Sequence, residues 1–147
     1  MPLSSDDAAV RCCVYDIALR SGAVPSRREV ARALGRTDVE VASSLGRLHA
    51  AHQLVLGPGG EILMAMPFSA VPTPFVVSSG SLQAFANCGW DALGVAAMLH
   101  RDAVVVTSCA DCGEALEITV TNSRVEGAAL LHFALPVRRW WESVVFT

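Results

Sequence analysis

Residues 67–80 read Pro-Phe-Ser-Ala-Val-Pro-Thr-Pro-Phe-Val-Val-Ser-Ser-Gly, and this stretch decides how the chain is divided. Its three prolines forbid a helix and favour extended backbone. The residues before it have a largely helical pattern, whereas those after it combine helix and strand patterns. The sequence therefore predicts an α+β protein with three parts: residues 1–66, a crossing segment at residues 67–80, and residues 81–147.

Signals for three helices and a hairpin precede the crossing segment. Apolar side chains recur at helical spacing over residues 6–20. Ser26 with Glu29, and Thr37 with Glu40, have the spacing of capping boxes, which begin helices expected to end near Leu34 and His52. Residues 54–56 and 61–64 flank Gly-Pro-Gly-Gly, a strong hairpin signal. This order predicts a winged helix-turn-helix in residues 1–66.

The charge of the chain does not favour binding to nucleic acid. The formal net charge is -3, and the third predicted helix offers only Arg47, His49 and His52 as contacts for DNA. DNA-binding domains normally present a denser cationic face. DNA is therefore not an expected partner. We favour a structural or dimerising role for the winged helix, and a homodimer is one form that this role could take.

Composition and hydropathy favour a folded, cytoplasmic protein. Hydrophobic residues make up 52% of the chain and charged residues 17%, which argues against disorder. The first residues lack a basic region followed by an apolar run, and no stretch reaches the roughly 18 apolar residues that span a bilayer. We therefore expect a cytoplasmic location and no membrane partner.

The second half is expected to contain a small mixed β-sheet with helices. The predicted elements are a helix at residues 82–99, strands at 103–107 and 115–121 joined by a turn at 109–113, and further strands at 129–135 and 142–147. This arrangement places the chemically distinctive side chains of the sequence in a helix and in a turn.

Three cysteines and one aspartate carry most of the chemistry of the chain. Cys88 and Asp91 are three residues apart, so a helix would place the thiol and the carboxyl on one face. Cys109 and Cys112 form a Cys-x-x-Cys pair in the predicted turn. The odd number of five cysteines excludes a complete set of intrachain disulfides. Clustered thiols in a reducing compartment indicate metal binding or catalysis.

The same four residues allow a metal site. Thiolates select soft metals such as Zn, Cu(I) and Hg. Cys88, Cys109, Cys112 and Asp91 together would complete a closed tetrahedral set suited to structural zinc. A protein that holds Zn, Cu or Hg without turnover is therefore one interpretation of this half.

The sequence Phe-Ala-Asn-Cys-Gly-Trp-Asp at residues 85–91, followed by Ser-Cys at 108–109, resembles the core of the organomercurial (alkylmercury) lyase family. The segment at residues 67–75 is similar to members of this family too, and the resemblance extends over about residues 67–135. It implies a winged helix followed by a mixed sheet with helices. The implied activity is protonolysis of carbon-mercury bonds, with no cofactor required and an organomercurial or soft metal ion as the partner.

The resemblance also implies roles for individual residues. Cys88 and Cys109 would be the thiolates that capture mercury, and Asp91 would be the acid that protonates the leaving carbon. Bound metal would then be the Hg product. Members of the family carry a further cysteine after the second catalytic one, whereas this sequence has no cysteine after Cys112.

Three hypotheses from different classes follow. The protein is a lyase acting through Cys88, Asp91 and Cys109, a metal-binding or metal-sensing protein using Cys88, Cys109 and Cys112, or a winged-helix regulator whose second half senses a ligand. An open coordination position would separate the first hypothesis from the second, and salt-dependent DNA binding would identify the third.

Overall fold

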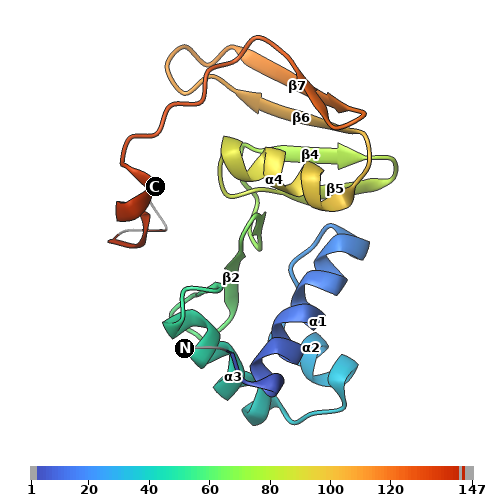
Figure 1. Ribbon diagram of the computed structural model, residues 1–147, viewed down its shortest axis with the longest axis vertical. Coiled ribbons are helices and arrows are strands. Elements are labelled where there is room, and N and C mark those ends of the chain that lie inside the picture. Colours follow the sequence, from blue (N-terminus) through green and yellow to red (C-terminus); the bar gives the residue numbers. More distant parts are fainter. Residues whose placement is uncertain (1–2, 143, 145–147) are drawn as a thin grey trace.

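The computed structural model describes residues 3–142 and residue 144, and it places helices in one part of the molecule and a larger sheet in the other (Figure 1). The first part holds three helices and a three-stranded sheet: α1 (Ser5–Ser21), α2 (Arg27–Leu34), α3 (Asp38–Ala50), β1 (Val55–Leu56), β2 (Ile62–Ala65) and β3 (Phe68–Ser69). The second part holds a five-stranded sheet and two helices: β4 (Val76–Ser79), β5 (Leu82–Phe85), α4 (Gly89–Leu99), β6 (Ala103–Ser108), β7 (Ala115–Thr121), β8 (Arg124–Glu126) and the 3-10 helix η1 (Val137–Glu142).

Local capping signals determine where the helices of the first part begin. The hydroxyls of Ser26 and Thr37 accept from the N–H groups of Glu29 and Glu40, and both reciprocal capping boxes form. These bonds satisfy donors that a helix leaves free at its N-terminus. The three predicted helices and the hairpin are present within one or two residues of their expected bounds. The winged-helix assignment itself stays a prediction, as does the division at residues 67–80.

The larger sheet has the order β5-β4-β6-β7-β8, and every described pair of neighbouring strands in it is antiparallel. The prediction of a mixed sheet is therefore wrong. The connection through α4 does make β5 and β6 parallel to each other, but β4 lies between them and is antiparallel to both. As a result, β5 and β6 end at the same edge of the sheet.

Three predicted elements differ from the structure. Residues 82–85 form β5 instead of the first turns of a helix, because they pair with β4. Residues 129–135 form no strand, because this apolar run pairs with no other strand. Of the predicted strand at 142–147, Glu142 ends a 3-10 helix, and residues 143 and 145–147 lie outside the described residues.

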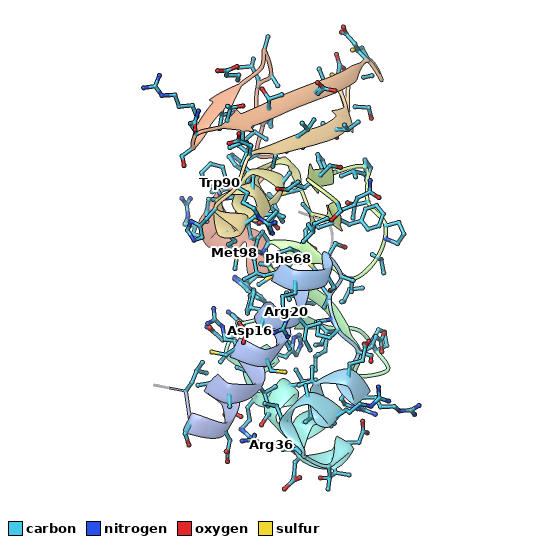
Figure 2. All side chains as sticks on the ribbon, turned by 90° about the vertical axis from the view of Figure 1, so that its right-hand side faces the viewer. Asp16, Arg20, Arg36, Phe68, Trp90 and Met98 are labelled. Atoms are coloured by element: carbon cyan, nitrogen blue, oxygen red, sulfur yellow. The ribbon has the colours of Figure 1, made fainter. Side chains whose placement is uncertain are left out.

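Two clusters of buried side chains meet at the end of α1. One cluster lies among α1, α2, α3, β1 and β2, and the other packs α4 against the five-stranded sheet. Tyr15 contacts both clusters, and Phe68, which is fully buried, lies in the second cluster with Ala18 of α1 (Figure 2). Gly22 caps α1 at φ +77° and lies against the backbone of Gln83, where a Cβ atom would have no space. The first part is thus held directly against β5.

Candidate functional site

The first turn of α4 places Cys88 and Asp91 in contact through the Asp91 N–H. Cys88 is the N-cap residue, with extended backbone, and its Sγ accepts a hydrogen bond of 3.4 Å from the N–H of Asp91. Cys88 therefore lies just outside the helix, in contrast to the prediction that both residues share a helical face. A cap and the third helical residue are close neighbours in any capped helix, so the expected proximity holds by a different geometry.

Asp91 is held in place by the amide of Asn87. Asn87 Nδ2 donates to Asp91 Oδ2 at 2.9 Å and to the carbonyl oxygen of Pro67 at 3.1 Å. Burial raises the pKa of Asp91 above its ordinary value, and the hydrogen bond from Asn87 opposes this rise in part. The carboxyl therefore accepts a proton more readily than an exposed aspartate does.

The pKa of the Cys88 thiol is also raised, again chiefly by burial. The hydrogen bond from the Asp91 N–H lowers the pKa, whereas the negative charge of Asp91 adds to the rise. Both groups of the pair thus favour their protonated forms. A pair of this kind can pass one proton from sulfur to oxygen when a metal ion replaces the thiol proton.

The sequence interpretation assigned no role to Asn87 or Tyr15. Asn87 Oδ1 is buried and has no hydrogen-bond partner among the described residues, so it is available to accept a bond at the site. The Tyr15 hydroxyl donates to the carbonyl oxygen of Met66 at 2.8 Å. Burial raises the pKa of Tyr15, and the charge of Asp91 contributes to the rise, so α1 supplies a wall near the carboxyl. The sequence could have pointed to Asn87 as a site residue, because it directly precedes Cys88. It holds no comparable indication for Tyr15.

Cys109 and Cys112 lie in the predicted turn between β6 and β7. The turn is closed by a bond from the Gly113 N–H to the Cys109 carbonyl oxygen at 2.9 Å, and Gly113 adopts φ +74°. Cys109 accepts hydrogen bonds from the N–H groups of Cys112 and Asp111 and from the Cys112 side chain, and these bonds lower the pKa of the Cys109 thiol. Cys112 is exposed and Cys109 is partly exposed. This turn thus favours a thiolate at Cys109.

The two pairs of candidates lie at one edge of the sheet. Val76 of β4 pairs with Phe85 of β5 on one side and with Val106 of β6 on the other. Cys88 and Cys109 each follow three residues after these partners. Neighbouring strands are about 5 Å apart, so β5 and β6 are separated by roughly 10 Å. The chain segments that carry the two thiols therefore leave the sheet at the same edge, on either side of β4.

The closed zinc set of Cys88, Cys109, Cys112 and Asp91 is not assembled in this structure. Within residues 3–142 and 144, no group of three or more His, Cys, Asp or Glu side chains could hold a metal ion. The Cys88 sulfur accepts from the first turn of α4, whereas the Cys109 sulfur accepts from the amides of its own turn. The structure therefore contains two separate pairs, Cys88 with Asp91 and Cys109 with Cys112.

The segment after β8 passes the start of α4. Leu131 lies so close to Gly89 that a Cβ atom there would be 2.7 Å from Leu131 Cδ2, and the ring of Phe133 meets Trp90 edge-on at 6.2 Å. Farther along, the ring of Trp141 stacks on His52 at 4.1 Å. In Figure 1 this segment runs in red along one side of the molecule. It supplies apolar side chains next to Gly89 and Trp90, in place of the strand expected at residues 129–135.

Tyr15 also lines a cavity of about 290 Å³. It is lined by Arg11, Cys12, Tyr15, Asp16, Met66 and Met98, and Figure 2 shows Asp16 on α1 and Met98 near Phe68. None of the candidate residues Cys88, Asp91, Cys109 or Cys112 lines it. In the described part of the chain, no helix is both long enough and apolar enough to cross a membrane.

Comparison with known proteins identifies the family. The sequence profile described as alkylmercury lyase, MerB, matches residues 68–147. A crystal structure described as the mercury-bound form of MerB2 has the same fold, with a TM-score of 0.64 and 23% sequence identity; the match covers 86% of this chain and 60% of that one. A sequence search of curated proteins gives no match. Because the family profile covers more than half of its residues, this chain belongs to the alkylmercury lyase family.

Proposed function

We propose that this protein cleaves carbon-mercury bonds by protonolysis, with Cys88 as the capturing thiol and Asp91 as the proton donor. The observation that carries the proposal is the contact of these two residues at the first turn of α4, with Asn87 orienting the carboxyl. Membership of the alkylmercury lyase family supports the reaction class. Mercury enters this reaction as part of the substrate.

In the proposed reaction one proton moves twice. The Cys88 sulfur bonds to the mercury of R-Hg-X, X leaves as an anion, and the thiol proton passes to the Asp91 carboxylate. Burial raises the pKa of Asp91, which makes the carboxyl a better acceptor for this proton. Asp91 then protonates the carbon, the electrons of the carbon-mercury bond form the new C–H bond, and R-H leaves while Hg(II) stays on Cys88.

Cys109 is the proposed second thiolate. Its support is the shared sheet edge and the hydrogen bonds that favour the thiolate form. Because β5 and β6 are roughly 10 Å apart, transfer from Cys88 requires the turn at residues 109–113 to approach α4. Soft Hg(II) exchanges readily between thiolates, which makes such a step chemically reasonable. The winged-helix assignment for residues 1–66 belongs to the same proposal, with a structural role in supporting the wall near Asp91.

Hydrocarbon release tests the proposal directly. Reduced protein would be incubated with phenylmercury and excess monothiol, and benzene would be measured together with protein-bound mercury. Release of more than one benzene per chain is the expected result. Bound mercury without benzene would contradict the lyase proposal. It would support the second candidate function, a thiol-based protein that holds soft metals without turnover, which the pair of partly exposed Cys109 and exposed Cys112 favours.

The pH profile of kcat/KM is expected to be bell-shaped. Its acid limb should lie at a pH above the ordinary pKa of a carboxyl, and its alkaline limb at a pH above the ordinary pKa of a thiol. Activity should fall on the acid side when Asp91 becomes protonated before it can accept the thiol proton, and burial raises this pKa. It should fall on the alkaline side when Cys88 has lost its proton, and burial raises that pKa as well. The measurement is initial benzene release across pH, since kcat/KM reports groups of the free enzyme. An acid limb at or below the pKa of an exposed carboxyl would contradict the assigned role of Asp91.

A further inference from the structure

We propose that Cys109 and Cys112 form a separate two-thiolate site that binds a soft, two-coordinate metal ion, Hg(II) in particular. The binding capacity depends on the turn alone. Its role as the acceptor of mercury from Cys88 rests on the function proposed above.

The backbone of the turn already holds both sulfurs together. The bond from the Cys109 N–H to the Glu114 carbonyl oxygen, at 2.8 Å, and the bond from the Gly113 N–H to the Cys109 carbonyl oxygen, at 2.9 Å, close the loop at the end of the β6–β7 hairpin. The Cys112 side chain bonds to the Cys109 sulfur. Because the two thiols are neighbours before any ion arrives, little conformational entropy is lost when both bind it.

The turn is also open to solvent. Cys112 is exposed, Cys109 is partly exposed, and nothing lies within 4 Å of the position that a Cβ atom would take on Gly113. An ion can therefore reach both sulfurs without a rearrangement of the sheet. The six residue pairs between β6 and β7 make this hairpin a firm base for the turn.

The number of ligands selects the kind of metal. Structural zinc requires four ligands, but no group of three or more His, Cys, Asp or Glu side chains that could hold a metal is found among the described residues, which include Asp111 and Glu114. Two thiolates suit soft ions that accept two-coordinate binding. The chemistry of the pair therefore favours Hg(II) over zinc.

Placement at the sheet edge explains how the pair could receive mercury. Cys88 and Cys109 follow strands that flank β4 and end at the same edge. A single thiolate at Cys88 competes with small thiols on equal terms, whereas a pair gains from the effective concentration of its second thiol. Mercury released from carbon at Cys88 would thus be retained more strongly at the turn.

A retention experiment tests the inference with inorganic Hg(II) as the probe. Protein reduced with a phosphine would receive one equivalent of HgCl2 and then increasing 2-mercaptoethanol, and protein-bound mercury would be measured by mass spectrometry after gel filtration. We expect Cys112→Ser to lower the monothiol concentration that removes half of the mercury by about 10²-fold. Cys12→Ser removes another exposed thiol and serves as the matched control, with retention unchanged.

Retention by Cys88→Ser separates the two sites. The inference would be supported if Cys88→Ser retains as much mercury as the wild type and Cys112→Ser retains less. Equal retention in wild type and Cys112→Ser would overturn it, as would loss of retention in Cys88→Ser alone. Benzene release is measured separately, so a protein that retains mercury through Cys112 but releases no benzene would disprove the lyase proposal and leave the two-thiolate site standing.

Discussion

Replacing Asp91 with Asn is expected to slow hydrocarbon release about a thousandfold, because a positioned general acid contributes roughly 10²–10⁴ in rate. Asparagine has nearly the same shape, and its carbonyl oxygen can still accept the bond that Asn87 donates at 2.9 Å. It cannot take the thiol proton or deliver it to carbon. Single-turnover release of benzene from phenylmercury would measure the loss, which corresponds to about 4 kcal/mol in activation free energy.

Cys88→Ser provides the contrast for this experiment. It removes the sulfur that captures mercury, so both initial capture at this position and benzene release should be lost. Asp91→Asn should still capture phenylmercury at Cys88, as detected by the mass of the adduct on a Cys88-containing peptide. Full turnover in Asp91→Asn would rule out Asp91 as the proton donor.

Replacing Asp7 with Asn is expected to destabilise the fold by breaking the ion pair of a buried carboxylate remote from the site. Asp7 is 4% exposed and its carboxylate bonds to Nε and Nη2 of Arg47 at 3.0 and 2.7 Å, which joins α1 to α3. The hydrogen bond from Arg47 is the main cause that lowers the pKa of Asp7 from 3.8 to about 2. Allowing for solvent screening of the half-exposed Arg47, this shift corresponds to about 2 kcal/mol of unfolding free energy.

The pH dependence gives the sign of this effect. A carboxyl whose pKa is lower in the folded state stabilises the fold at pH values above its pKa in the unfolded state. This contribution is lost as the pH falls through the pKa of the folded state. Urea unfolding should therefore show a difference of about 2 kcal/mol between wild type and Asp7→Asn at pH 7, declining between about pH 4 and pH 2. Asp6→Asn is the matched control, because the Asp6 carboxyl is 69% exposed in its pair with Arg36. An equal loss in both variants would contradict the argument.

The helical half could be predicted from the sequence because its signals are local. Ser26 with Glu29 and Thr37 with Glu40 are capping boxes that need no distant contact to form. Residues 82–85 were wrongly expected to be helical because a short apolar run fits either element, and pairing with β4 decides between them. Residues 129–135 have an apolar strand pattern but no partner strand.

In the candidate site, too, the local features were predictable from the sequence and the contacts between distant elements were not. The three-residue spacing of Cys88 and Asp91 indicates their proximity in a helix or at its cap, and the structure has the capped form. The bond from Asn87 to Pro67 and the position of Tyr15 depend on contacts between elements far apart in the sequence. The spacing of Cys109 and Cys112 does not reveal that their sulfurs bond within the turn instead of joining Cys88.

The position of β4 between β5 and β6 separates the two thiol pairs onto different connections. Cys88 and Asp91 belong to the junction of β5 and α4, whereas Cys109 and Cys112 belong to the tip of a hairpin. The tip can gain or lose a thiol without changing the register of β4 or the cap of α4. In the proposed reaction, the lifetime of the bound product and the speed of its formation would then be independent traits, and evolution could alter one while preserving the other.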